Sequence, residues 1–190
     1  SPAAGVLTPH IMRYGGDRIW FMGSRVRPVT LDLLDFGIGR RSHLPLDRMV
    51  PVDVATGAGM LVARRVFEQV GLLDETFFFY YEDIDFSLRV SQAGFEIWSV
   101  PSARMWHKVS ASIGHCSPLQ AYHHARGSVY FYYKHTVGWQ RGLILMYRLG
   151  SALRSTLRHA WHGRFRHIVN YWQGLHDGWQ ALFRKLGESE

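Results

Sequence analysis

Short runs of apolar residues alternate with turn residues through the first hundred positions of the chain. Their length and their β-branched and aromatic content predict buried strands, whereas two segments with a period near 3.6 predict helices that stop at Gly71 and Gly94. The predicted strands are residues 5–8 with 11–12, 18–22, 50–63 and 95–100, the last ending at Pro101. The predicted helices are residues 65–70 and 82–93. This mixture predicts an α/β fold.

Residues 25–47 show few periodic signals and contain Pro28, Pro45, Gly37 and Gly39. We interpret this stretch as a long excursion, and such excursions in compact domains are often functional.

From Ser117 onward the pattern becomes helical, over residues 119–133, 142–160 and 165–186. One face of each of the last two helices is apolar, with Leu143, Met146, Leu149, Leu153, Leu157, Ile168, Trp172, Leu175, Trp179 and Leu182. The other faces carry Arg148, Arg154, Arg158, Arg164, Arg166, Arg184 and Lys185. Such a pattern is typical of helices that lie on a membrane surface. The alternative is a pair of helices packed on the domain with a solvated basic face.

Length, composition and charge limit the number of domains and the kinds of partner that this chain can have. The 190 residues suit one domain or a large part of one, and the 47% hydrophobic content can build a core. The net charge is +7, of which residues 138–190 contribute +5, so a basic surface could serve nucleic acid, anionic lipid or a phosphorylated substrate. No apolar run reaches the length of a transmembrane helix. The single cysteine, Cys116, excludes an internal disulfide and fits a reducing compartment.

The most informative stretch is residues 77–89, FFFYYEDIDFSLR, where five aromatic residues lead into Glu82 and Asp83 at a helix start. Burial against rings raises the pKa of a carboxyl group, while a helix N-terminus favours its charged form. These opposed influences could adjust the pKa of a carboxylate that acts as a catalytic base. The alternative is that both residues are first-turn acids that complement the helix dipole.

Other polar positions are weaker candidates. Small residues at positions 56–59, TGAG, would let a ligand approach the backbone, although a strand bulge is equally consistent and the phosphate-binding glycine patterns are absent. His107 follows a predicted strand, where sites of α/β proteins commonly lie. The cluster His115, His123 and His124 lacks a metal-binding spacing. The Asp83-Ile84-Asp85 motif lies on a helix start, so we do not expect it to bind a divalent metal.

No Ser-His-Asp set, cysteine nucleophile or nucleic-acid-binding motif can be recognised.

Residues 52–107 resemble bacterial family-2 glycosyltransferases, and most closely the rhamnosyltransferase-like branch that extends cell-surface polysaccharides. The resemblance is carried by residues 57–65 (GAGMLVARR), 67–75 (FEQVGLLDE), 77–89, 93–95, 100–101 and His107, with residues 17–20 and Gly23 before them. Residues 121–187 are more loosely similar to the helical C-terminus of that family.

The resemblance implies a GT-A fold and sugar transfer with inversion at the anomeric carbon. Asp83 would then be the general base, Glu82 would hold acceptor hydroxyls, and Mg²⁺ or Mn²⁺, with His107 as a ligand, would neutralise the departing diphosphate. Lys108 would contact the diphosphate. The residues expected to line the acceptor and donor-sugar pocket are Thr56, Gly57, Ala58, Gly59, Glu82 and Trp106.

The family pattern also includes a Rossmann-like nucleotide site and an Asp-rich metal motif, which residues 1–48 do not show. We therefore expect residues 1–116 to form the acceptor-side part of a GT-A domain, followed by a basic helical region over residues 117–190. The chain would be the C-terminal part of a transferase or a natural truncation. In either case it should bind nucleotide poorly and should not turn over alone.

The expected function is transfer of a sugar, with rhamnose suggested by the family likeness, from a nucleoside-diphosphate sugar to a hydroxyl group. The acceptor would be a cell-surface glycan or its lipid-linked precursor, at the cytoplasmic face of the inner membrane. The alternative is a non-catalytic basic module that docks on membranes or other anionic surfaces. Nucleic-acid binding rests on charge alone and is not expected. The donor, the linkage and the oligomeric state stay open.

Overall fold

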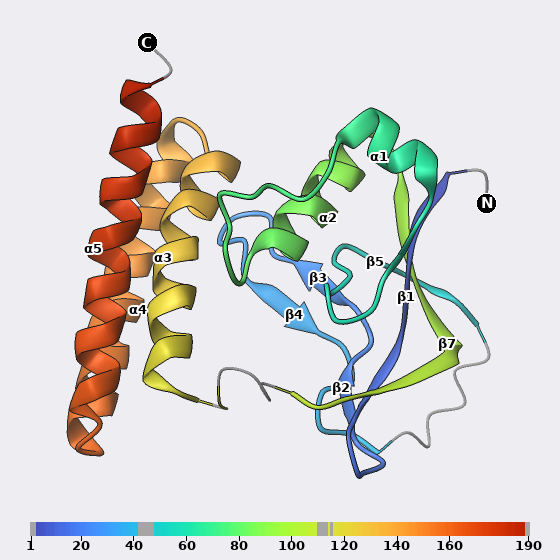
Figure 1. The fold of residues 1–190 in the computed structure, drawn as a ribbon, viewed down its shortest axis with the longest axis horizontal. Coiled ribbons are helices and arrows are strands. Elements are labelled where there is room, and N and C mark those ends of the chain that lie inside the picture. Colours follow the sequence, from blue (N-terminus) through green and yellow to red (C-terminus); the bar gives the residue numbers. More distant parts are fainter. Residues whose placement is uncertain (1–2, 42–47, 110–113, 115, 189–190) are drawn as a thin grey trace. The chain divides into compact units, whose positions relative to one another are not determined.

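The computed structural model describes residues 3–41, 48–109, 114 and 116–188. The chain forms two compact units, which we call the sheet unit and the helical unit (Figure 1). The sheet unit comprises Ser1–Thr76 and Glu82–Val109, and the helical unit comprises Phe77–Tyr81 and Ser110–Glu190. The aromatic run of residues 77–81 therefore belongs to the helical unit, while the two acids that follow it belong to the sheet unit.

A five-stranded mixed sheet forms the centre of the sheet unit. Its long strands β1 (Ala4–Arg13) and β7 (Glu96–His107) run parallel, and shorter strands pair antiparallel along their outer edges. The order is β2-β1-β7-β5, with β6 pairing to the N-terminal part of β1. The short strands are β2 (Ile19–Phe21), β5 (Val50–Val52) and β6 (Leu61–Val62).

Strand β7 corrects one prediction from the sequence. Pro101 does not end this strand, which continues to His107. The register with β1 shifts at this point, because Pro9 pairs with Val100 but the next residue, His10, pairs with Arg104. Such a bulge leaves residues outside the hydrogen-bond ladder, so it tolerates a proline, which has no N–H to donate.

The predicted excursion over residues 25–47 contains structure that the pattern did not indicate. Strands β3 (Ser24–Val26) and β4 (Leu33–Asp35) form an antiparallel hairpin. Pro45 lies outside the described residues. Strands of three residues are too short to show a period, which explains why the sequence pattern missed them.

Two helices complete the sheet unit, α1 (Arg64–Val70) and α2 (Glu82–Gln92), both close to their predicted ranges. They contribute to the main core, which contains Val6, Val52, Ala55, Val66, Phe86, Val90 and Ile97. The fully buried Asp85 accepts a hydrogen bond from Nε of Arg89 at 2.9 Å. The guanidinium group of Arg89 also donates to the carbonyl oxygens of Val70 and Leu72, so α2 is fastened to the end of α1.

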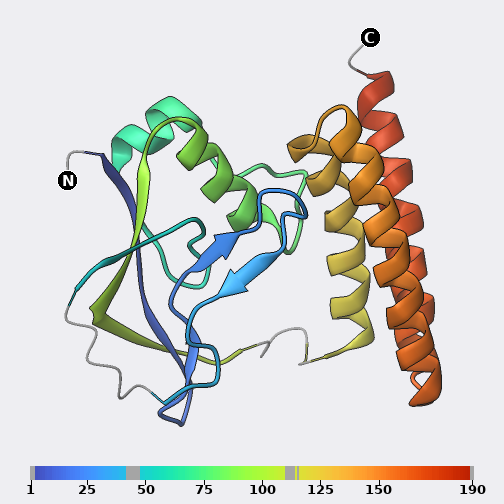
Figure 2. The same ribbon diagram turned by 180° about the vertical axis from the view of Figure 1, so that it is seen from behind.

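The helical unit contains α3 (Pro118–His135), α4 (Trp139–Trp161) and α5 (Phe165–Gly187), each within three residues of its predicted ends (Figure 2). The Ser117 hydroxyl caps α3 by accepting the N–H of Gln120 at 3.0 Å. Helix α5 approaches α3 through Gly174 and Gly178. A Cβ atom at Gly174 would clash with the carbonyl oxygen of Tyr122, and one at Gly178 would lie 2.8 Å from that of Arg126.

Within the described part of the chain, none of the helices combines the length and hydropathy needed to cross a bilayer.

Candidate functional site

The Asp83 carboxylate is the best-positioned candidate group in the sheet unit. It stands in the first turn of α2 and is half-buried. One oxygen, Oδ2, accepts the backbone N–H of Gly57 at 2.9 Å, and the other, Oδ1, accepts the N–H of Ile84 at 2.9 Å. A carboxylate offers about four lone-pair directions, so each oxygen keeps a position for a further donor. The two N–H groups thus fix the carboxylate while leaving it able to accept a proton.

The 56–59 turn lies directly beside the acids of α2. A Cβ atom at Gly57 would lie 3.8 Å from Cβ of Asp83 and 3.9 Å from Oε1 of Glu82, which is ordinary van der Waals contact. The structure therefore brings together two segments that the family resemblance assigned to one pocket. Within the turn, the N–H of Gly59 donates to the Thr56 carbonyl oxygen at 3.0 Å, and the N–H of Ala58 lies 3.4 Å from Thr56 Oγ1.

The sheet and α2 hold this turn in place from opposite ends. The hydroxyl of Thr8 on β1 donates to the carbonyl oxygen of Gly59 at 3.1 Å. A Cβ atom at Gly59 would clash with the sulfur of Met105 on β7, so a larger residue there would require the Met105 side chain to shift. At the other end, the buried hydroxyl of Ser87 on α2 accepts the N–H of Ala55 at 3.2 Å.

Sequence reasoning missed the supporting residues Thr8 and Ser87. Ser87 lies four positions after Asp83, on the same side of α2. Its place on a helix face that also buries Val90 could have indicated that this polar side chain has a structural partner.

One carboxylate oxygen of Glu82, Oε2, is buried without a hydrogen-bond partner among the described residues. Burial, followed by the neighbouring charge of Asp83, raises the pKa of Glu82 above its ordinary value of 4.5. Buried polar atoms in folded proteins almost always have partners, so an orphaned oxygen beside a candidate base is a natural position for a ligand hydroxyl.

The aromatic residues before Glu82 adopt an unusual backbone. Tyr80 and Tyr81 have φ angles of 66° and 73°, a left-handed conformation that costs free energy for residues with a side chain. The buried Tyr81 ring packs against Phe131 of α3 with a centroid separation of 4.9 Å, and its hydroxyl lies 3.2 Å from Nδ1 of His124. Backbone strain of this kind clusters at functional sites. The influence of the rings on the acids stays a prediction.

His107 and its neighbours lie at the carboxyl end of the parallel strand pair. His107 pairs in register with Arg13, and its ring centroid is 4.7 Å from that of Trp20. Strand alternation places His107 on the same side of β7 as Met105, about 7 Å along the strand. Because Met105 abuts Gly59, His107 shares a face of the sheet with the 56–59 turn.

The other two residues predicted at this end are arranged differently. Alternation places Trp106 on the opposite side of β7, where it is 56% exposed. Lys108 is exposed, and its ammonium nitrogen is 4.6 Å from the ring centroid of Tyr14. The proposed roles of both residues in binding sugar and diphosphate stay predictions.

The described residues do not by themselves form a site for Mg²⁺ or Mn²⁺. Across residues 3–41, 48–109, 114 and 116–188, no group of three His, Cys, Asp or Glu side chains converges. Asp83 and Asp85 do not share an ion, because Asp85 is turned into the core toward Arg89. Of the histidine cluster, His123 lies near Phe78, His124 lies near Tyr81, and His115 is outside the described residues. His107 could supply only one ligand of a larger set.

Comparison with known proteins adds independent information. Models of known protein families give no match. The N-acetylglucosaminyl-diphospho-decaprenol L-rhamnosyltransferase of Mycobacterium tuberculosis is 38% identical over 109 residues, which cover 56% of this chain and 35% of the relative. The low-salt glycan biosynthesis hexosyltransferase Agl10 of Haloferax volcanii is 47% identical over 47 residues, or 25% of this chain and 15% of the relative.

A third relative is the dTDP-rhamnosyl transferase RfbF of Shigella flexneri, 30% identical over 84 residues that cover 40% of this chain and 28% of the relative. The matched residues thus span between 15% and 35% of the length of these relatives. The mixed α/β sheet unit followed by helices agrees with the predicted partial GT-A fold. The chain therefore carries a glycosyltransferase-like region that is similar to rhamnosyltransferases and other hexosyltransferases.

Proposed function

We propose that this chain forms the acceptor-side part of an inverting, family-2 glycosyltransferase. The observation that carries the proposal is the Asp83 carboxylate, held by the Gly57 N–H beside the orphaned oxygen of Glu82. The similarity to rhamnosyltransferases, one of them a dTDP-rhamnosyl transferase, supports a sugar donor of the nucleoside-diphosphate class and rhamnose as the sugar. They also support a lipid-linked glycan acceptor, which would place the protein peripherally at the cytoplasmic face of the inner membrane during cell-envelope polysaccharide synthesis.

In the proposed reaction, an acceptor hydroxyl group attacks the anomeric carbon of the donor sugar. Asp83 takes the proton of that hydroxyl as the new C–O bond forms. The bond from the anomeric carbon to the diphosphate oxygen breaks, and the nucleoside diphosphate leaves with the electron pair. Attack from the face opposite the leaving group inverts the configuration of the anomeric carbon.

Glu82 would position the acceptor in this reaction. Its orphaned Oε2 would pair with an acceptor hydroxyl, and burial, followed by the charge of Asp83, raises the pKa of this carboxyl group. Thr56, Gly57, Ala58 and Gly59 would line the sugar pocket, because their small side chains leave the backbone accessible. Trp106 would contribute to sugar binding and Lys108 would contact the diphosphate.

A dependence on Mg²⁺ or Mn²⁺ is a separate part of the proposal. Because the described residues lack a complete ligand set, His107 would act together with ligands from outside them. The steps above are therefore written for the residues of this chain alone.

The decisive experiment is Asp83→Asn in the intact transferase that contains this chain. Asparagine can still accept the N–H of Gly57 but cannot take a proton, so we expect transfer to fall by about a hundred- to ten-thousandfold. The matched control is Glu75→Gln, an exposed acid in the preceding loop, which should transfer sugar normally. Circular dichroism should show that both variants fold. Wild-type turnover in Asp83→Asn would exclude this residue as the base.

A further inference from the structure

The apolar side chains of α4 and α5 lie on the outside of the helical unit. They recur every three or four residues and so form one stripe along each helix. On α4 the stripe consists of Trp139, Leu143, Met146, Leu153, Leu157 and Trp161. On α5 it consists of Phe165, Val169, Trp172, Trp179, Phe183 and Leu186. Every one of these side chains is at least 37% exposed, and Trp161 reaches 88%. We call the two stripes together the outer apolar face.

The inward sides of the same helices bury few large apolar side chains, Ile144 on α4 and Leu182 on α5, compared with the twelve that the outward sides expose. Helix α4 buries Ile144 and Ala152, with Arg148 half-buried between them and its guanidinium carbon 5.0 Å from the ring centroid of Tyr132 on α3. Helix α5 meets α3 through Gly174 and Gly178. In a helix that only packs on a protein core the richest apolar side is buried, so this arrangement is the reverse of the usual one.

Within the helical unit, two leucines of the α4 stripe illustrate this exposure, because Leu153 and Leu157 are 59% and 62% exposed.

The two stripes lie on the same side of the unit. Helices α4 and α5 run side by side as a hairpin joined at residues 162–164, and α3 packs mainly along α5 (Figures 1 and 2). The indole N–H of Trp172 donates to the Thr156 hydroxyl at 3.1 Å, which marks where the helices meet. Helix α5 turns Gly174 and Gly178 toward α3, and helix α4 turns Arg148 toward it, so both stripes point away from α3. Exposed apolar surfaces of this extent mark interaction sites.

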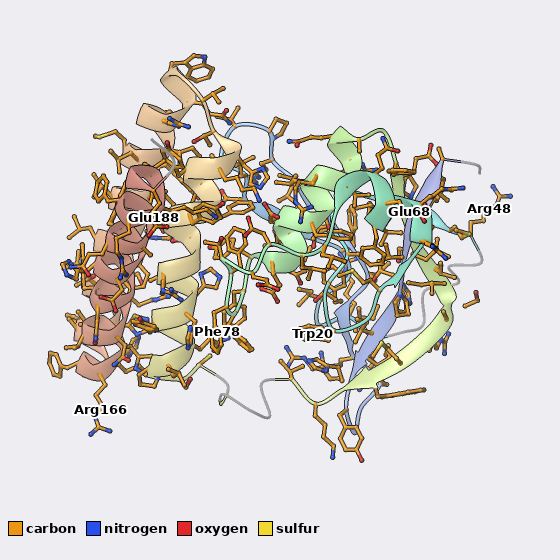
Figure 3. All side chains as sticks on the ribbon, turned by 45° about the horizontal axis from the view of Figure 1, so that its top comes forward. Trp20, Arg48, Glu68, Phe78, Arg166 and Glu188 are labelled. Carbon is orange, nitrogen blue, oxygen red and sulfur yellow. The ribbon has the colours of Figure 1, made fainter. Side chains whose placement is uncertain are left out.

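Positive charge borders the outer apolar face. Residues 139–188 contain eight Lys and Arg but only two Asp and Glu. Of these two acids, Asp177 accepts the hydroxyl of Tyr122 on the α3 side. Arg154 and Arg158 lie about a quarter-turn from the α4 stripe, and Arg166 and Arg184 lie similarly beside the α5 stripe. All four are exposed, and Figure 3 shows the Arg166 side chain extending away from the helix.

We propose that the outer apolar face docks on an anionic lipid bilayer, with α4 and α5 parallel to its surface. The apolar side chains enter the boundary of the acyl chains, the tryptophans occupy the interface, and the arginines pair with anionic headgroups. Charge complementarity selects this partner, because a second copy of the same surface would bring the arginine borders of two chains together. The inference deepens the membrane location in the proposed function, but it concerns a different unit from the catalytic site.

The experiment is co-sedimentation of the 190-residue chain with phosphatidylcholine vesicles, with and without phosphatidylglycerol. We expect binding to the anionic vesicles that weakens with salt. Replacing Leu153 and Leu157 by serine should weaken it at least tenfold. The matched control replaces Leu61 and Leu72, which are 68% and 72% exposed in the sheet unit, and should bind as the wild type does. All four leucines are exposed, so the folded state should survive, which circular dichroism can verify.

The contribution of charge is tested with a second pair of variants. Arg154→Gln and Arg158→Gln should each weaken binding about fivefold. The control changes Arg27→Gln and Arg48→Gln, which are exposed arginines of the sheet unit, and should have no effect on binding.

Two results would overturn the proposal: a wild-type chain that ignores anionic vesicles, or a Leu153/Leu157 variant that binds them normally. Sedimentation velocity without vesicles tests the competing occupant. A dimer that dissociates only in the Leu153/Leu157 variant, with vesicle binding unchanged, would assign the face to a second copy of the chain. Because vesicle binding is measured without sugar transfer, a failure here leaves the proposed catalytic role of Asp83 intact.

Discussion

The two units of this chain distribute their apolar side chains in opposite ways. In the sheet unit, Val66 and Phe86 are fully buried, and the polar groups of the candidate site lie around the turn beside them. In the helical unit, Leu153 and Leu157 are mostly exposed, while the contact between α3 and α5 is made at glycines. The sheet unit is therefore stabilised mainly by apolar burial, whereas the helical unit combines a smaller apolar core, including Phe131 and Leu182, with close backbone packing and leaves much of its apolar surface exposed.

Truncating one large apolar residue in each unit gives the largest expected contrast. Phe86→Ala should lower the free energy of unfolding of the sheet unit by about 3–5 kcal/mol, because the side chain is fully buried. Leu157→Ala should change the stability of the helical unit by less than about 0.5 kcal/mol, because its side chain is exposed. Amide hydrogen exchange, read from peptides of each unit, measures both values. Equal losses would remove the contrast between the units.

Loss of the ion pair between Asp85 and Arg89 of α2 should cause the next largest decrease in the free energy of unfolding. Asp85→Ala leaves the guanidinium group of Arg89 without its buried partner, which should cost about 3 kcal/mol. The control is Glu68→Ala, which removes an exposed pair with Arg64 at the same i, i+4 spacing and should cost less than about 1 kcal/mol. Urea unfolding of both variants makes the comparison. A small effect in Asp85→Ala would mean that Arg89 alone fastens α2.

Glycine-to-alanine changes should have opposite signs at two places in the helical unit. Gly174→Ala introduces a clash with the carbonyl oxygen of Tyr122 and should destabilise the unit by about 1–3 kcal/mol. Gly150→Ala on α4 meets open space and should stabilise its helix by up to about 1 kcal/mol. Thermal unfolding followed by circular dichroism distinguishes them. If both changes stabilised the protein, α3 and α5 would not pack through glycines.

The smallest expected effect concerns pH and the candidate site. The raised pKa of Glu82 means that the folded protein binds this proton more tightly than the unfolded chain does. The free energy of unfolding of the wild type should therefore fall as the pH rises from about 4.5 to the pKa of Glu82 in the folded protein. The Glu82→Gln variant has no carboxyl group at this position, so its free energy of unfolding should not fall for this reason. Urea unfolding of both proteins between pH 4 and pH 8 should show the variant gaining relative stability with pH. A constant difference would mean that the pKa of Glu82 is not raised.

Much of this fold could be predicted from local patterns. The three long helices and α2 were found because their apolar periods extend over at least three turns. Strand β7 was cut short at Pro101 because a bulge depends on the partner strand, which a single segment does not reveal. The hairpin of β3 and β4 was missed because three-residue strands carry no period.

Local patterns predicted the parts of the candidate site, whereas only the family resemblance placed those parts in one pocket. Glu82 and Asp83 stood out beside the aromatic run, and the 56–59 turn stood out by its small residues. The hydrogen bond from Gly57 to Asp83 joins positions 26 residues apart, so no local pattern could indicate it. Periodicity likewise located the stripes of α4 and α5 but not their exposure, since a stripe looks the same whether it faces protein, lipid or water.

The bond between Gly57 and Asp83 also determines how the site responds to mutation. Its donor is a backbone N–H, so no amino acid at position 57 except proline can delete it. A Cβ atom there would meet both acids only at ordinary contact distance, so alanine should be accommodated. In a saturation library, position 57 should therefore tolerate small residues and reject proline, whereas position 83 should tolerate nothing. The position of the Asp83 carboxylate thus depends largely on main-chain groups, which most amino acid substitutions leave unchanged.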